Sequence, residues 1–477
     1  MRNVLALFCL LACAFSVQSQ APYQAVLDVY TDLSYMPADA QPYIRYLDLG
    51  NLTGDKEEYQ RYINILSGHV NLLSKYSKIQ PPVLVKNYLL RMDIRDYAWD
   101  PKVYEQFAID DPYYHIKATI TPATPAKEDK KVDPAKKADV KDLWAPWLYQ
   151  DANGLQKLTK MYDATGSTTI ILRADWFFHQ TAVQEQRTVG YYGMLGIKKI
   201  EDFEAAMRFD RKLTKDLERT RVVMSSEITL EPRRLEAVKS ATGDVWRTFD
   251  SEVAIGKKNP LEFLDDELEY DASEQFGHLP NGLPVWWLGN GKDVLQDKAP
   301  DNIVGGDQTK VGERRGRGND RRLHISLSCI RCHFTGANDG VKEFTAEHID
   351  RLVSVSYEKK KELEAKYLAE IEPRVKASRL VYETAIKQAA GMPSKEFGKA
   401  YDEFWSRYDN AHVDLKRAAA DMGVEPAQLQ TSLDRQQKIL GRLHSSLNII
   451  KNGGYIPINQ WQEVYSLAHA YLRGVQP

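Results

Sequence analysis

The chain contains segments in which apolar residues recur with the spacing of an α-helix. Between residues 57 and 77, apolar side chains return every three or four positions, among them Tyr62, Ile65 and Leu66. This spacing predicts a helix with one buried face. His69 lies on the same apolar face, so we expect it to be a core histidine with hydrogen-bond partners rather than a ligand.

Three shorter segments predict strands. Residues 81–100 mix apolar runs with alternation, which favours one or two strands. Residues 167–181 (STTIILRADWFFHQT) begin with β-branched residues typical of a buried strand and continue into aromatic residues. In residues 278–295, an Asn281-Gly282 pair and a Gly-Asn-Gly sequence flank an apolar run, which predicts a β-hairpin.

The remainder of the chain is strongly helical in pattern. Thr345 is a candidate N-cap for a long helix that continues to about residue 375, and residues 458–472 place their apolar side chains on one face. We therefore expect an α+β fold, mainly helical. A mixed N-terminal domain would span residues 20–300, and a helical domain would span residues 301–477.

Composition and charge narrow the range of functions. The 477 residues include 43% hydrophobic and 27% charged residues, the proportions of a globular protein. A net charge of −2 provides no basic field for nucleic acid, so we expect no nucleic-acid partner. Residues 121–141 are rich in Pro, Ala and Lys and lack large apolar residues, which is typical of a solvated loop or linker.

The N-terminus predicts export. Arg2 precedes an apolar run from Val4 to Phe15, which is too short to span a bilayer and is typical of a signal peptide over residues 1–19. The alternatives are a lipoprotein signal modified at Cys13 and a buried N-terminal helix. No later run approaches 18 apolar residues, so we expect no transmembrane segment after cleavage and a periplasmic or extracellular location.

The mature chain would retain only two cysteines, and they form a pattern with chemical meaning. Cys329 and Cys332 are followed directly by His333, which is the signature of c-type haem attachment. On one helical turn, both thiols reach the two haem vinyl groups, and the imidazole becomes the proximal iron ligand. The alternatives are a thiol redox pair, a zinc site that would need more ligands than His324, and chance co-occurrence.

The second axial position of the iron is less defined. Met392 precedes a proline and stands 59 residues after His333, as in the Met-Pro loops of small cytochromes, so we take it as the candidate distal ligand. The bland interpretation is that Met392 only follows a helix end. An open coordination position also remains, and other candidate ligands are present: Met194, Met422, His348 and His444.

Two charged groups invite a functional interpretation. The basic run between Arg314 and Arg322 could dock an acidic redox partner or neutralise haem propionates, although a solvated loop is the simpler interpretation. Arg173, Asp175 and Trp176 have the composition of a peroxidase site. Neighbours at a strand end need not share a pocket, so we favour a structural ion pair.

Five phrases together resemble one protein family. They occur in the order YIRYLDLGNL, LLRMDIRDYAWD, RADWFF, HLPNGLPVWWL and SLSCIRCH. They are similar to large secreted bacterial proteins with a cytochrome c domain and one c-type haem, over residues 43–475. The resemblance implies one haem c held by Cys329 and Cys332, with His333 as proximal ligand. It implies neither a reaction nor a distal ligand.

We therefore expect an exported mono-haem cytochrome that transfers single electrons to or from a redox partner protein. Its helical domain, residues 301–477, would resemble class I cytochromes c. The alternatives are a peroxidase-like haem enzyme and a haem-based sensor or binding module. Both would give a role to the large N-terminal domain, which electron transfer alone does not require.

Overall fold

The computed structural model describes residues 22–52, 55–113, 152–184, 189–211, 219–226, 228–263, 267–299, 323–337, 349–350, 355–367 and 371–473. The predicted signal peptide, the loop at 121–141 and the basic run Arg314–Arg322 lie outside these residues. Helices and strands both contribute substantially to the described part, which confirms the α+β class.

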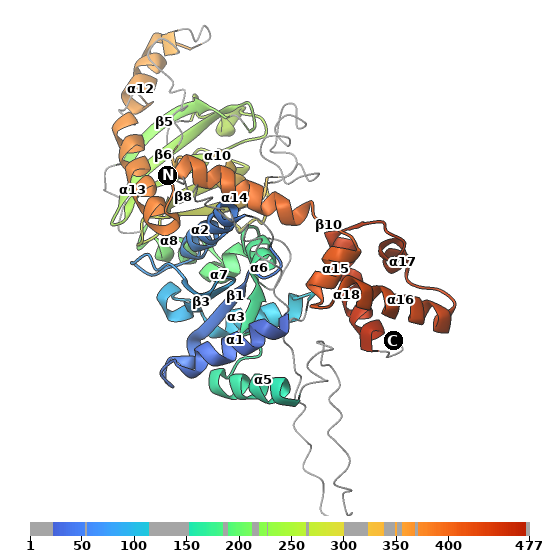
Figure 1. The fold of residues 1–477 in the computed structure, drawn as a ribbon. Helices are drawn as coiled ribbons and strands as arrows, with labels where there is room; N and C mark the ends of the chain where they lie inside the picture. Colours follow the sequence, from blue (N-terminus) through green and yellow to red (C-terminus); the bar gives the residue numbers. More distant parts are fainter. Residues whose placement is uncertain are drawn as a thin grey trace, which may run out of the picture.

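A mixed four-stranded sheet forms the lower part of the molecule in Figure 1. Its order is β2 (Val83–Lys86), β3 (Leu89–Asp93), β1 (Ile44–Asp48) and β4 (Ile171–Arg173). β1 pairs antiparallel with β3 and parallel with β4, with Asp48 opposite Arg173. The helices that accompany this sheet are α1 (Pro22–Ser34), α2 (Lys56–Leu72), α3 (Pro101–Asp110), α5 (Ala152–Thr165), α6 (Ala174–Thr181), α7 (Tyr191–Leu195) and α8 (Ile200–Ala206).

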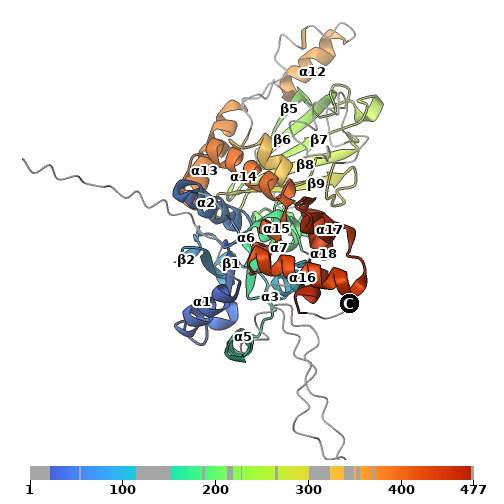
Figure 2. The same ribbon diagram turned by 45° about the vertical axis from the view of Figure 1, so that its right-hand side comes forward.

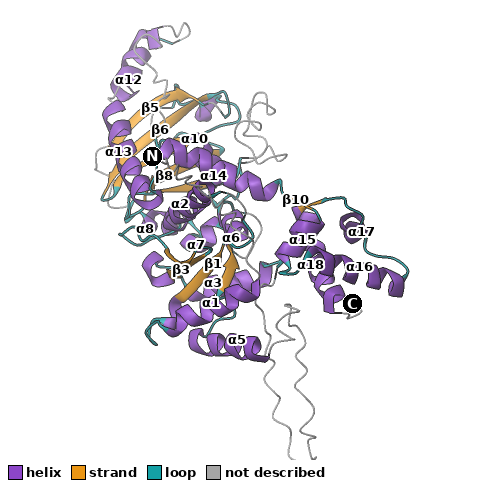
Figure 3. Ribbon diagram, viewed as in Figure 1, coloured by secondary structure: helices purple, strands orange, loops and turns teal. Residues whose placement is uncertain are grey.

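A second, antiparallel sheet of five strands lies above the first in Figure 3. Its strands follow chain order: β5 (Arg219–Ser225), β6 (Pro232–Ser240), β7 (Gly243–Phe249), β8 (Ala272–His278) and β9 (Pro284–Asn290). β8 and β9 form the hairpin predicted around Asn281-Gly282, with His278 paired to Pro284. The Asn281-Gly282 pair predicted this turn correctly because Gly282 adopts φ +86°, a conformation that favours glycine.

The C-terminal part is helical. α10 (Leu327–Cys332), α12 (Tyr357–Tyr367), α13 (Glu372–Ala390) and α14 (Ser394–Asp409) lie beside the sheets, and Figure 2 shows the remaining helices as a group. That group consists of α15 (Leu415–Asp421), α16 (Pro426–Leu440), α17 (Ser445–Lys451) and α18 (Ile458–Arg473), with the short strands β10 (His412–Val413) and β11 (Ile456–Pro457). No described helix is long and apolar enough to cross a membrane.

The long helix expected from Thr345 to about residue 375 is wrong in its described part. A new helix begins at Tyr357, where the hydroxyl of Ser356 accepts the backbone N–H of Lys359 at 3.2 Å. Another begins at Glu372, with Pro373 in its first turn. A hydroxyl that caps backbone N–H groups and a proline at a helix start both favour new N-termini over continuation.

The prediction for residues 167–181 is confirmed only for the strand. β4 ends at Arg173, and the aromatic residues that follow belong to α6. His69 is a core histidine as predicted: its Nδ1 lies 2.9 Å from the Tyr401 hydroxyl and its Nε2 lies 2.6 Å from the Thr181 hydroxyl. Burial lowers the pKa of His69 to about 3, so this imidazole is neutral.

One large hydrophobic core connects the N-terminal and C-terminal parts of the chain. It extends from Ala25 to Tyr471 and includes Cys329 and Met392. α13 packs on α2, and α14 packs on α2, α6 and α10. The helical part therefore shares its core with elements on the other side of the expected boundary at residue 300.

Candidate functional site

The haem-attachment signature occupies a short, locally strained helix. α10 begins after Ser326, whose φ of +67° and ψ of −68° accompany a three-residue turn from the Leu327 N–H to the Ile325 carbonyl, 3.0 Å apart. This type of γ-turn is rare and strained, and such strain tends to occur at functional sites. Cys329 and Cys332 then lie three positions apart within α10.

The two thiols differ in their surroundings. Cys329 is 7% exposed, whereas Cys332 is partly exposed, and no disulfide joins them. Burial raises the pKa of the Cys329 thiol well above its usual value, and the carboxylate of Glu274 adds to this increase. Reactive redox thiols need a lowered pKa, so these surroundings disfavour the thiol redox interpretation.

His333 follows α10 directly and has an oriented imidazole. Its Nδ1 lies 3.2 Å from the carbonyl oxygen of Gly336. A carbonyl only accepts hydrogen bonds, so Nδ1 carries the proton and Nε2 carries the lone pair. This is the tautomer in which imidazole binds iron through Nε2, and a backbone carbonyl is a common partner for the other nitrogen of such a ligand.

Neighbouring elements hold the motif on several sides. The ring of Phe276 on β8 lies 5.6 Å from the imidazole of His333 and stacks on Trp246 of β7. On the other side, α14 approaches so closely that a Cβ on Gly398 would lie 2.3 Å from the Cβ of Phe334. Gly336 adopts φ +87° against Tyr382 of α13.

Arg331, inside the motif, anchors α10 to α14. Its guanidinium pairs with the carboxylate of Asp402 and lies 5.6 Å from the ring of Trp405. The motif is thus part of a packed interface between the five-stranded sheet and two helices.

Three buried donors belong to the motif or to the elements packed around it. Trp246 Nε1, the Tyr382 hydroxyl and Arg331 Nη1 have no hydrogen-bond partner among the described residues. A buried donor without a partner costs about 1–3 kcal/mol, so such atoms indicate where an acceptor belongs. Haem propionates are acceptors of this kind. The two thiols and the oriented imidazole are the groups that attachment of haem c requires.

The structure places the other candidate iron ligands as follows. Met392 is buried in the turn between α13 and α14, after Gly391 ends α13 in the left-handed conformation. Met194 and Met422 are buried in the same core. His444 caps α17, where its Nδ1 accepts the Ser446 N–H at 3.3 Å. His348 lies outside the described residues, and the role of Met392 as distal ligand stays a prediction.

Among the described residues, no group of three or more His, Cys, Asp or Glu side chains is placed to hold a metal ion. His324, the candidate additional zinc ligand, is buried and forms a bridge to Lys298 through the backbone.

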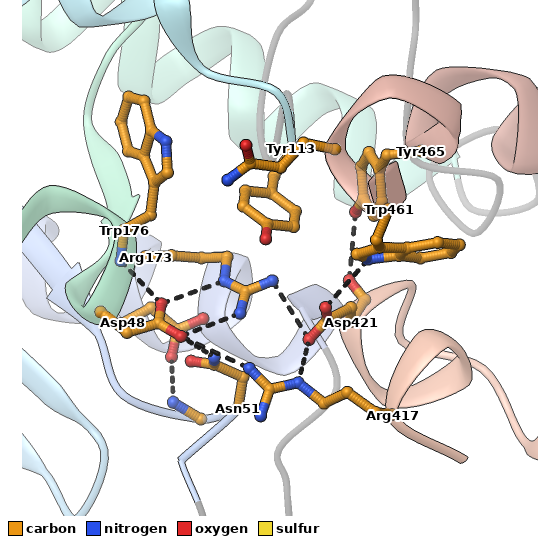
Figure 4. Close-up of polar contacts among 12 residues, drawn as sticks. Asp48, Asn51, Tyr113, Arg173, Trp176, Arg417, Asp421, Trp461 and Tyr465 are labelled. Atoms are coloured by element: carbon orange, nitrogen blue, oxygen red, sulfur yellow. Dashed lines mark hydrogen bonds and ion pairs between the residues drawn. The ribbon is translucent and has the colours of Figure 1, made fainter. Parts of the chain in front are cut away.

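A second polar cluster lies at the carboxyl ends of the parallel strands β1 and β4 (Figure 4). Arg173 pairs with Asp175 at 3.1 Å and with Asp421 at 3.1 Å, so the predicted structural ion pair is confirmed. Arg417 contacts the same two carboxylates, at 3.4 and 3.0 Å. Two arginines and two acids from distant parts of the chain therefore neutralise each other inside the protein.

The protonation of this cluster follows from its neighbours. Burial opposes ionisation of Asp175, but Arg173 and Arg417 outweigh it and lower the pKa of that carboxyl. Asp48, in contrast, has its pKa raised to about 6 by burial, against the hydrogen bond that it accepts from the Gly50 N–H. We therefore interpret this cluster as a structural connection between the sheet and α15.

Sequence reasoning missed most of this cluster. Asp48, Arg417 and Asp421 stand in segments with no chemical motif, and only the fold brings them to Arg173. A signal was present for Asp48, because β1 and β4 both end in a charged residue.

Comparisons of the chain with family models, curated proteins and solved structures find no match.

Proposed function

We propose that this protein is an exported mono-haem c-type cytochrome that transfers single electrons. Cys329 and Cys332 would hold the haem covalently, and His333 would bind its iron. The observation that carries the proposal is the geometry of the motif: two thiols on one short helix, followed by an imidazole whose Nδ1 is fixed by Gly336. The resemblance of the five sequence phrases to secreted cytochrome c domain proteins also supports it.

The side chains around the motif have defined tasks in this proposal. The Gly336 carbonyl keeps the imidazole in one orientation and one tautomer. Phe276 and Trp246 exclude water from one side of that ring, and the donors of Tyr382 and Arg331 would bind propionates. The haem would supply an iron that alternates between the ferric and ferrous states.

The distal ligand and the partner belong to the same proposal. Met392 would complete the coordination of the iron as its sixth ligand. A sixth ligand from the protein distinguishes an electron carrier from an open, ligand-binding site. A redox partner protein would dock near Arg314–Arg322, where the sequence contains five arginines whose charge would attract an acidic partner. Export to the periplasm or the cell exterior would follow from the N-terminal signal.

Absorption spectra of the ferric and ferrous protein, with and without carbon monoxide, test this function. A low-spin ferric spectrum with a weak far-red sulfur-to-iron band supports methionine ligation and electron transfer. The Met392→Ala variant should lose that band, whereas Met422→Ala, a matched buried methionine, should keep it. A high-spin iron that binds carbon monoxide readily in the unmodified protein would contradict the electron carrier.

A further inference from the structure

A cleft of about 660 Å³ lies between the five-stranded sheet and α13, and none of its lining residues belongs to the cysteine motif. Arg219, Lys239 and Asp244 line it from β5, β6 and β7, and Arg374 and Ser378 line it from α13. With Thr220 and Ser240, the lining combines three basic side chains, one acid and three hydroxyls. The haem proposal uses none of these residues.

Ser378 and a histidine behind it form a directed hydrogen-bond chain. Ser378 Oγ lies 2.8 Å from Nε2 of His278, and Nδ1 of that histidine lies 3.1 Å from the carbonyl oxygen of Gly282. The carbonyl must accept, so Nδ1 carries the proton and Nε2 must accept from Ser378. The serine hydroxyl therefore donates its proton to His278, and Ser378, which is 3% exposed, belongs to the cleft lining.

This is the arrangement of an activated nucleophile. A hydroxyl, a base within about 3 Å and a third group that orients the base are the structural signature of nucleophilic catalysis. The backbone carbonyl of Gly282 has the orienting position that a carboxylate has in a catalytic triad. Burial lowers the pKa of His278, which keeps its imidazole in the neutral form that a general base requires.

The hairpin turn between β8 and β9 positions the Gly282 carbonyl beside Nδ1 of His278. Gly282 adopts φ +86°, and a Cβ there would lie 3.1 Å from Ala385 and 3.4 Å from Val381, both on α13. Only a residue without a side chain lets the turn approach the helix this closely. The Asn281-Gly282 sequence thus both forms the hairpin and brings the Gly282 carbonyl to His278.

The charges of the cleft indicate the class of substrate. Arg374 pairs with Asp244 at 2.7 Å and donates to the Thr220 hydroxyl at 2.8 Å, so it is held in one orientation at the cleft wall. Arg219 and Lys239 add positive charge at the exposed rim. Because Asp244 pairs with Arg374, the rim position of Arg219 and Lys239 is what favours a substrate that carries a negative charge.

We propose that Ser378 is the nucleophile of a second site, which hydrolyses esters with an anionic group. The serine oxygen would attack the ester carbonyl carbon while its proton passes to Nε2 of His278. The alcohol would then leave with that proton, and water would release the carboxylic acid from the serine. The balance needs only ester and water. The site is independent of haem.

A fluorophosphonate probe tests the nucleophile directly on the full chain. The serine oxygen would form a bond to phosphorus and fluoride would leave, which gives a stable adduct. Mass spectrometry of peptides from the unmodified protein should place this adduct on Ser378. An unlabelled protein, or an adduct on another residue, overturns the proposal, and neither result requires a variant that folds.

Variants then separate catalysis from hydrogen bonding alone. His278→Gln should lower the labelling rate at least about 100-fold, as expected for loss of a general base, whereas Ser432→Ala, a buried serine on α16, should leave it unchanged. Circular dichroism verifies that each variant is folded. Unchanged labelling of a folded His278→Gln variant would contradict the assigned base.

The hydrolysis rates of an anionic and a neutral ester test whether the site prefers a negatively charged substrate. Hydrolysis of anionic 4-nitrophenyl succinate should exceed that of the neutral butyrate ester. Lys239→Gln should lower kcat/KM about threefold for the succinate alone, the effect of one exposed charge pair. Equal losses for both esters would contradict recognition of a negative charge.

Discussion

At the scale of residues, Asp48 is the acid whose protonation the fold changes most clearly. It is 5% exposed beside Arg173 and accepts the Gly50 N–H at 2.7 Å. Asp175 belongs to the same cluster, and Arg173 and Arg417 lower the pKa of its carboxyl, which keeps it ionised. The same buried site therefore contains one acid that is stabilised as an anion and one that resists ionisation.

This difference predicts a pH dependence of stability. The pKa of Asp48 is raised to about 6 in the folded chain, above its value of about 4 in the unfolded chain. Between pH 4 and pH 6 the folded protein holds a proton that the unfolded chain has lost, so stability falls as pH rises through this window. Asp48→Asn keeps an oxygen that accepts the Gly50 N–H. This variant should lose about 2–3 kcal/mol less unfolding free energy between pH 4 and pH 6 than the unmodified chain.

Urea unfolding at pH 4.5 and pH 7 measures the effect. The free energy of unfolding of Asp48→Asn, relative to that of the unmodified chain, should be higher at pH 7 than at pH 4.5. Asp163→Asn changes an exposed acid at the end of α5 and serves as the control. Equal differences at both pH values would show that Asp48 ionises normally.

The residue-scale predictions from sequence succeeded where partners are near in the chain. Arg173 and Asp175 are two positions apart, so a local pattern contained their ion pair. Asp421 reaches Arg173 from 248 positions away, and nothing in its own segment indicates the contact. Ser378 and His278 are separated by 100 positions in the same way.

At the scale of elements, α10 and α14 are joined by a close backbone approach. α10 contacts α14, and Phe334, two residues after the end of α10, lies over Gly398 of α14. The elements that sequence predicted well have strong local signals, such as the turn between β8 and β9 and the apolar face of α18. The break before α13 was missed because the helical spacing of apolar residues continues across Pro373, although proline favours a new N-terminus.

Gly398→Ala tests the contact between α10 and α14. The new Cβ would lie 2.3 Å from the Cβ of Phe334, and the cost of this overlap should exceed the gain in helix propensity. We expect a loss of about 1–3 kcal/mol in the free energy of unfolding. Lys399→Ala, at a neighbouring side chain that is 77% exposed, should change it by less than about 0.5 kcal/mol. A stabilised Gly398→Ala protein would contradict the packing.

At the scale of the whole molecule, the helical part is built into the core of the N-terminal part. The Ser67 hydroxyl of α2 donates to the Ala389 carbonyl of α13 at 2.5 Å, and a Cβ on Gly68 would lie 2.4 Å from the ring of Phe397. Asp421 at the end of α15 completes the charge cluster of β1 and β4. The boundary suggested by sequence composition therefore crosses a continuous set of contacts.

A chain of residues 301–477 produced alone should for this reason fail to form a stable fold. It would expose the faces of α13 and α14 that pack on α2, and it would leave Asp421 without Arg173. Near-ultraviolet circular dichroism and thermal unfolding measure this, with the full chain as control. A cooperative unfolding transition of the fragment would show that the helical part is an independent domain.

The most direct test of the account is covalent haem attachment in a host that matures c-type cytochromes. The exported protein should retain one haem after denaturation, measured by intact mass and by the absorption spectrum of the reduced pyridine complex. Cys329→Ser with Cys332→Ser should retain none. If the unmodified protein carries no covalent haem, while a known c-type cytochrome matures in the same cells, the account is contradicted.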